Sequence, residues 1–171
     1  MLSLPSAFLD WVPMQQAPTP DTPRPPWSSA AAAVLPALTQ QLHRFFHGMD
    51  ARRYEDMLAL FTDDARWLRQ GQWLVGKPAI EAALRARPAD QDTRHLMSNA
   101  HVAELDGDHA VLEACMTAYR YPAATEGVLP TSTGPLRLNR TTTVFRRDPG
   151  QDWRIAEQRL VPALDLAGSA S

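Results

Sequence analysis

Apolar residues recur at helical spacing in the first half of the chain and at alternate positions in the second half. A first helix is predicted to begin near Ser28 and Ser29, either of which can act as N-cap, and to break at Gly48 and Asp50. Its apolar stripe consists of Leu35, Leu38, Leu42, Phe45 and Met49. A second, short helix is predicted over residues 52–61, a hairpin over 65–70 and 72–75, and a third helix after Gly76.

Period-2 alternation predicts four strands, over residues 93–104, 109–121, 136–147 and 153–161. Helices followed by a run of antiparallel strands are typical of the α+β class. The helices must then cover one face of a curved sheet. The open end of such a cone is a natural pocket.

The strand predicted over 93–104 carries the polar residues that matter most for function. One face holds His95, Met97, Asn99, His101 and Ala103, and the other holds Leu96, Ser98, Ala100 and Val102. The first face either lines a pocket or leaves its polar residues at a sheet edge. The alternation leaves both possibilities open.

A chain of 171 residues with 44% hydrophobic residues suits one globular domain, which we assign to residues 29–162. Residues 1–28 contain seven of the 15 prolines and predict a flexible, extended N-terminal arm, or an arm that packs on a partner subunit. Residues 163–171 are predicted to form a flexible tail.

The charge balance makes nucleic acid an improbable partner. The chain has 17 Lys and Arg residues against 19 Asp and Glu, without a marked basic cluster. No apolar run has the length of a membrane span, and the N-terminus lacks a signal-peptide pattern. The single cysteine, Cys115, fits a reducing compartment, so a soluble, cytoplasmic protein is expected.

Four stretches resemble, in order and spacing, the SnoaL-like group of the nuclear transport factor 2-like superfamily. They are Phe45–Trp67, Gly76–Ile80, Thr93–Asn99 and Trp153–Ile155, and the resemblance covers residues 35–162. It implies a cone-shaped, curved antiparallel or mixed sheet wrapped around N-terminal helices, a cystatin-like α+β barrel. The small (β) subunits of aromatic-ring-hydroxylating dioxygenases are similar in the same stretches.

The resemblance also implies a catalytic pair. The pattern of scytalone dehydratase places its aspartate on Asp50 and its first histidine on His95, with His95 moving a proton and Asp50 orienting it. The second histidine of that pattern falls on Cys115, which departs from it. The alternative roles are a helix-terminating cap for Asp50 and a structural, hydrogen-bonded histidine for His95.

Further residues are predicted to bind a small, flat, apolar ligand, although each could instead belong to the core or to a bulge. They are Tyr54, Trp67, Met97, Asn99, Cys115, Thr117, Tyr119 and Asn139. His43 and His47 stand four apart on a helix, but the glutamate and third ligand of a zinc motif are missing, so neither a metal nor another cofactor is predicted.

Two functions from different classes follow. The first is a cofactor-independent acid–base enzyme of the isomerase, dehydratase or cyclase type, or a binder of the same ligand. The second is a non-catalytic structural subunit similar to a dioxygenase β subunit. A homodimer is expected in the first case, and a trimer or a complex with a catalytic α subunit in the second.

Overall fold

A computed structural model describes residues 28–123 and 125–166. The predicted proline-rich arm, except for Ser28, lies outside the described residues, as does the end of the predicted tail. No helix within the described part of the chain is long and apolar enough to cross a lipid bilayer.

Three helices form close to their predicted positions: α1 (Ser29–Asp50), α2 (Tyr54–Leu58) and α3 (Gly76–Arg85). The Ser28 hydroxyl caps α1 by accepting a hydrogen bond from the Ala31 amide at 3.0 Å. Pro36 interrupts the hydrogen bonds inside α1, but it lies on the exposed side of the helix, where water can replace the missing donor.

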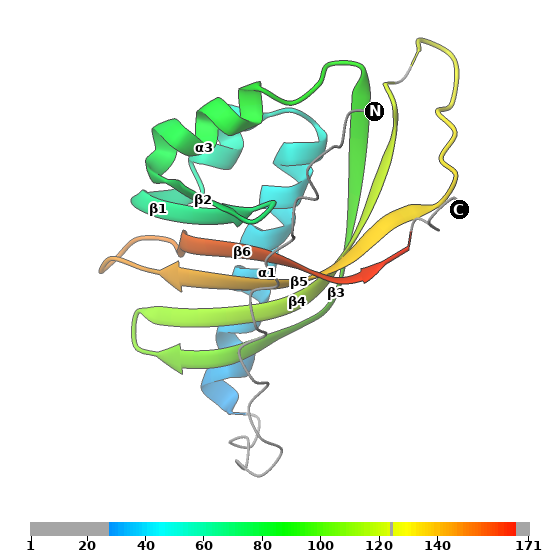
Figure 1. The fold of residues 1–171 in the computed structure, drawn as a ribbon. Coiled ribbons are helices and arrows are strands. Elements are labelled where there is room, and N and C mark those ends of the chain that lie inside the picture. The colour runs from blue at the N-terminus through cyan, green and yellow to red at the C-terminus, as the bar shows by residue number, and fades with distance from the viewer. Residues whose placement is uncertain (1–27, 124, 167–171) are drawn as a thin grey trace, which may run out of the picture.

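The six strands make one mixed sheet in the order β2-β1-β6-β5-β4-β3. The strands are β1 (Phe61–Arg69), β2 (Gln72–Val75), β3 (Gln91–Asp106), β4 (His109–Pro122), β5 (Pro135–Arg146) and β6 (Arg154–Asp165). Within the described residues, only β1 and β6 pair in parallel. Figure 1 shows the long strands β3, β4 and β5 bending strongly, with α1 running across the sheet. The predicted α+β class, with a curved mixed sheet and helices packed against it, is confirmed.

Aromatic side chains fix α1 against the sheet. The Phe45 ring meets Phe46, Phe61 and Trp67 edge to face, with ring centroids 4.9, 5.6 and 5.4 Å away. Gly48 brings α2 close to α1, since a Cβ at this position would lie 3.3 Å from the Cβ of Met57. These contacts hold the C-terminal end of α1, where Asp50 lies, in one place.

A β-bulge at Asn99 overturns the predicted faces of β3. Asn99 has a φ of 56°, and the register with β4 shifts between Ser98 and His101. An inserted residue moves the side chains that follow it to the opposite face, here as far as the second register shift between Val102 and Glu104. Ala100 and Val102 therefore pack on the core together with Met97, while Asn99 is exposed.

Strand β6 continues beyond its predicted end at residue 161, as far as Asp165. Pro162 is accommodated because the pairing of β5 with β6 is irregular there, between Leu138 and Asn139. The Leu166 amide still donates to the Leu136 carbonyl at 3.2 Å. The folded domain thus extends past residue 162, where the sequence placed its boundary.

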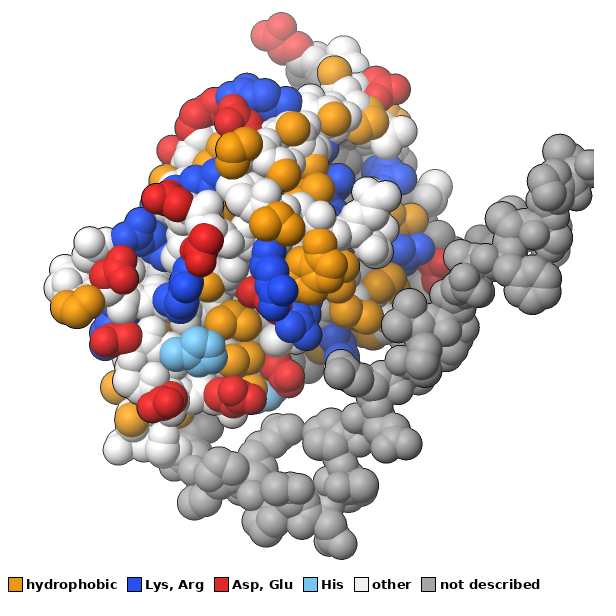
Figure 2. Space-filling model, turned by 60° about the vertical axis from the view of Figure 1, so that its left-hand side comes forward, with side chains coloured by type: hydrophobic (Ala, Val, Ile, Leu, Met, Phe, Trp, Pro, Cys, Tyr) orange, Lys and Arg blue, Asp and Glu red, His pale blue; other side chains and the backbone are white. Residues whose placement is uncertain are grey.

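Acidic and basic side chains are interspersed on the face shown in Figure 2, with hydrophobic side chains between them. Ion pairs also connect different strands, such as Arg146 with Asp64 and Arg66 with Glu157. This mixing agrees with the formal net charge of -2.

Candidate active site

A cavity of about 530 Å³ opens on the helix side of the sheet, and we call it the site cavity. Its size is typical of pockets that bind small molecules. Of the two predicted catalytic residues, His95 is part of the cavity wall, and Asp50 contacts His95 from behind the wall. The wall is formed by Met49, Trp67, Arg69, Gln70, Gly71, Arg87, Thr93, His95, Met116, Ala118, Tyr119, Arg120, Leu136, Arg137, Asn139, Leu160 and Pro162.

Asp50 and His95 meet where the end of α1 lies over the start of β3. One carboxylate oxygen of Asp50 lies 2.6 Å from Nδ1 of His95, and the other accepts the His95 backbone N–H at 2.9 Å. Both side chains are more than nine-tenths buried. The Phe46 ring packs against the imidazole, with centroids 5.1 Å apart. The His95 ring is therefore held by hydrogen bonds and by packing.

A chain of hydrogen bonds assigns the tautomer of His95. Arg87 donates to Oγ1 of Thr93 at 2.8 Å, so the Thr93 hydroxyl proton goes to Asp50, 2.9 Å away. An ionised Asp50 accepts all of these bonds, and Nδ1 of His95 must then carry a proton. In the neutral imidazole, Nε2 then carries the lone pair, and it has no hydrogen-bond partner among the described residues. This is the arrangement of a histidine base oriented by a carboxylate.

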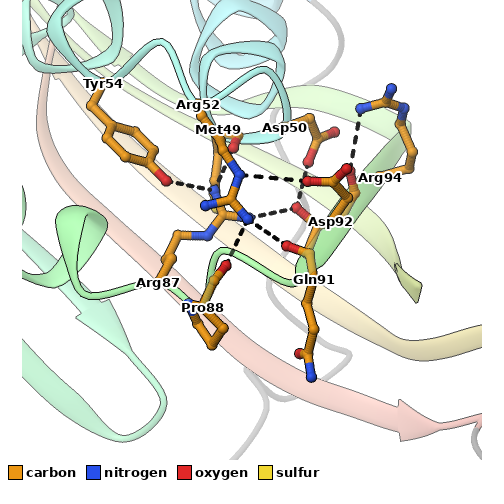
Figure 3. Close-up of polar contacts among 10 residues, drawn as sticks. Met49, Asp50, Arg52, Tyr54, Arg87, Pro88, Gln91, Asp92 and Arg94 are labelled. Carbon is orange, nitrogen blue, oxygen red and sulfur yellow. Dashed lines mark hydrogen bonds and ion pairs between the residues drawn. The ribbon is translucent and has the colours of Figure 1, made fainter. Parts of the chain in front are cut away.

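Two arginines tie the segment before β3 to the end of α1, as Figure 3 shows. Besides Thr93, Arg87 donates to the Met49 carbonyl and to the Tyr54 hydroxyl, which is 3.4 Å away. Arg52, in a left-handed conformation with φ 55°, donates to the Pro88 carbonyl at 2.6 Å. The position of Asp50 relative to β3 thus depends on side chains far from it in sequence.

Three of the predicted binding residues line the site cavity. Trp67 is fully buried, and Asn139 is 8% exposed. Tyr119 reaches the cavity beside Ala118, its neighbour on β4, because the register of β4 and β5 shifts at this point. Tyr54 lies just outside the wall, in contact with Arg87.

Four predicted binding residues lie elsewhere. Met97 packs on the hydrophobic core, and Asn99 is exposed in the bulge. Cys115 and Thr117 lie on the outer face of the sheet, where Thr117 pairs with the exposed Leu96. The inner face of β4 instead presents Met116 and Ala118, which were not among the predicted binding residues. The two faces of β4 are similarly apolar, so the alternation could not distinguish them.

Several wall residues were missed in the sequence. Thr93 was detectable, because it lies two residues before His95 on the same strand face. Arg87 follows α3 in an irregular segment, and no periodicity places it near Asp50. Arg69 is recognisable only in the structure. Burial, and then repulsion from Arg87, lowers the pKa of its guanidinium there.

Metal-binding geometry is missing from the part of the chain that the structure describes. No group of three or more His, Cys, Asp or Glu side chains there could hold a metal ion. His43 and His47 point outward from α1 and are exposed. A second hollow of about 610 Å³ is lined by Asp and Arg side chains that pair with one another, including Arg147 with Asp108 and Arg154 with Asp148. It holds no buried acid–base pair.

The sequence profile of the SnoaL-like domain matches residues 32–159. The chain belongs to the SnoaL-like family. The resemblance inferred from the four stretches is thereby confirmed. Among curated proteins, none matches this SnoaL-like chain significantly.

Solved structures with a similar fold include proteins described as dehydratases and as a dehydrochlorinase, one of them of the nuclear transport factor 2-like family. A Streptomyces avermitilis protein described as a dehydratase of that family has 16% identity and a TM-score of 0.66, over 78% of this chain and 99% of its own. A Novosphingobium aromaticivorans protein described as a scytalone dehydratase has 16% identity and a TM-score of 0.64, over 80% and 89%. A type 2 hexachlorocyclohexane dehydrochlorinase has 17% identity and a TM-score of 0.64, over 80% and 91%. At such identities the likeness establishes the shared fold.

Proposed function

We propose that this protein is a cofactor-independent acid–base enzyme that acts on a small ligand bound in the site cavity. The observation that carries the proposal is the 2.6 Å contact between Asp50 and Nδ1 of His95, with His95 in the cavity wall. Asp50 fixes the tautomer, so that the Nε2 lone pair is available to accept a proton. Histidine suits this role because its ordinary pKa is near neutral pH.

The reaction begins with removal of a proton from a C–H bond next to a carbonyl group. Nε2 of His95 takes the proton, and the C–H electron pair becomes an enolate. The imidazolium then returns its proton, either to another carbon, which completes an isomerisation, or to a departing hydroxyl group, which leaves as water. Asn139 and Tyr119, which line the same cavity, would orient the carbonyl or hydroxyl group.

The related structures support an elimination in particular. Two of them are described as dehydratases and the third as a dehydrochlorinase, and each of these reactions removes a proton and a leaving group. A cavity with apolar side chains in its wall beside one buried base is the equipment that such chemistry needs. The alternative of a non-catalytic subunit gives no role to an oriented histidine in a cavity wall.

The test does not require the substrate to be identified first. Carbonyl and hydroxy-carbonyl compounds that raise the melting temperature of the protein would be incubated with it in D2O, and deuterium uptake and water loss followed by NMR. We expect His95→Gln to slow exchange at least about 10²-fold. His43→Gln, an exposed change on α1, serves as the matched control. Equal exchange in the wild type and His95→Gln would refute the proposal.

A further inference from the structure

Four arginines line the site cavity, while the described part of the chain contributes no Asp or Glu to its wall. They are Arg69 on β1, Arg87 after α3, Arg120 on β4 and Arg137 on β5. The chain as a whole has slightly more acidic than basic residues, so this excess of positive charge is local. Buried or half-buried guanidinium groups usually have an anionic partner.

Two of these guanidinium groups have uncommitted donors. Arg69 stacks on Trp67, 5.6 Å from the ring centroid, and forms no hydrogen bond or ion pair with the other described residues. Arg120, which is exposed at the rim, also has no such partner in residues 28–123 and 125–166. A guanidinium carries five N–H donors and no acceptor. Donors of both side chains are therefore available to a ligand.

Carboxylates of the described residues do little to neutralise the positive charge of the other two arginines. Arg87 donates to neutral oxygens of Met49, Tyr54 and Thr93, and it reaches Asp50 only through the Thr93 hydroxyl. Arg137 lies 3.6 Å from the largely exposed Asp165, and its buried Nε has no partner among the described residues.

The arginines also act on one another. The pKa of Arg69 is lowered first by burial and then by repulsion from Arg87, with Arg120 adding to the effect. A bound anion would remove this repulsion, and its attraction to the arginines would be strong in a partly desolvated wall.

We propose that the ligand of the site cavity carries a carboxylate group, which Arg69, Arg120 and Arg137 bind at the rim while an apolar body lies against Trp67 and Met116. A planar guanidinium binds a carboxylate through two parallel hydrogen bonds, so several such groups can hold one anionic end firmly. The inference rests on the proposed function for the reacting end of the ligand, near His95. The arginines at the opposite end of the ligand assign its class, which is small apolar carboxylic acids.

Matched pairs of acid and amide test the proposal. Benzoate, 3-phenylpropionate and 2-naphthoate would be compared with benzamide, 3-phenylpropanamide and 2-naphthamide by calorimetric titration of the full chain at low salt. Each pair has the same apolar body and differs in charge. We expect at least one acid to bind about tenfold or more tightly than its amide, and the difference to shrink as salt is raised. Equal affinities within every pair, or no binding of any acid, would overturn the proposal.

Variants show whether the arginines cause the preference. Arg69→Met and Arg137→Met should each reduce the affinity for the acid about tenfold and leave that for the amide unchanged. Arg140→Met is the matched control, because Arg140 is exposed on the same strand as Arg137 and outside the cavity wall. An equal loss in the control would contradict the proposal.

His95→Gln separates this inference from the proposed function. It should keep the preference for the acid while losing deuterium exchange. If His95→Gln loses exchange but the protein shows no preference for acids, the inference alone is refuted. If the preference for acids is present but His95→Gln exchanges as fast as the wild type, the proposed function alone is refuted.

Discussion

The carboxylate of Asp50 binds His95 at two points, the backbone N–H at 2.9 Å and ring Nδ1 at 2.6 Å. The residues come from α1 and β3 and are 45 positions apart. One side chain thereby fixes both the strand on which the histidine lies and the orientation of its ring. Nε2 is left without a partner among the described residues, on a side chain that forms part of the cavity wall.

The first prediction concerns this pair. In Asp50→Asn, the amide NH2 can face Nδ1, which must then accept and leave the proton on Nε2. We expect the tautomer to change in ¹⁵N-correlated NMR spectra and exchange activity to fall about 10²-fold or more. The free energy of unfolding should fall by about 1–3 kcal/mol. Asp92→Asn, which alters only a 3.5 Å contact with Arg52, is the control, and an unchanged tautomer in Asp50→Asn would contradict the hydrogen-bond assignment.

The second prediction concerns Arg87. Its guanidinium joins the Met49 carbonyl at the end of α1 to Thr93 on β3. Arg87→Met leaves both acceptors without that donor, and we expect the free energy of unfolding to fall by about 1–3 kcal/mol in urea denaturation. Arg87→Lys should recover only part of the loss, since an ammonium group cannot reach both acceptors with fork geometry. The neighbouring Arg85, exposed and paired with Glu81, provides the control Arg85→Met, which should cost less.

The sequence predicted Asp50 and His95 as a pair, which the structure brings together, but it placed several residues on the wrong face of their strand, for a physical reason. The two residues were found through the family pattern, in which a helix-ending aspartate and a strand histidine are spaced as they are here. The faces of β3 and β4 depend instead on bulges, at Asn99 and beside Ala118, and each bulge shifts the register by one residue. Arg87 depends on long-range contacts that alternation does not encode.

The bulge at Asn99 gives a third prediction. Asparagine tolerates the left-handed conformation, with φ 56° here, whereas a β-branched residue does not. Asn99→Gly should leave stability nearly unchanged. Asn99→Val should lower the free energy of unfolding by about 1–2 kcal/mol. Chemical denaturation of both variants tests this, with Ser98→Val, at an exposed neighbouring position outside the left-handed region, as the reference. Equal stability of Asn99→Val and the wild type would contradict the bulge.

A fourth prediction concerns pH. A hydrogen bond from Thr62, and then the Arg146 guanidinium, lower the pKa of Asp64 from its ordinary 3.8. A carboxyl whose pKa is lower in the folded state stabilises the fold above the unfolded pKa, and this stabilisation is lost as the pH falls through the folded value. The difference in stability between the wild type and Asp64→Asn should therefore be present at pH 7 and disappear below about pH 4. Asp90→Asn, an exposed change without side-chain contacts in the described structure, should show no such trend.

Self-association remains a prediction, and the outer face of the sheet is where we expect it. Leu96 and Leu164 lie in one cross-strand row with Thr117 and Leu138 between them, and they are 58% and 53% exposed. Apolar side chains gathered in this way favour contact with a second copy. We expect light scattering to give a dimer at micromolar concentration and Leu96→Glu to shift it towards the monomer. Leu129→Glu, at a 91% exposed loop position away from the sheet, should not. A monomeric wild type would refute the dimer, whereas a co-purifying oxygenase subunit would favour the structural-subunit alternative over the enzyme.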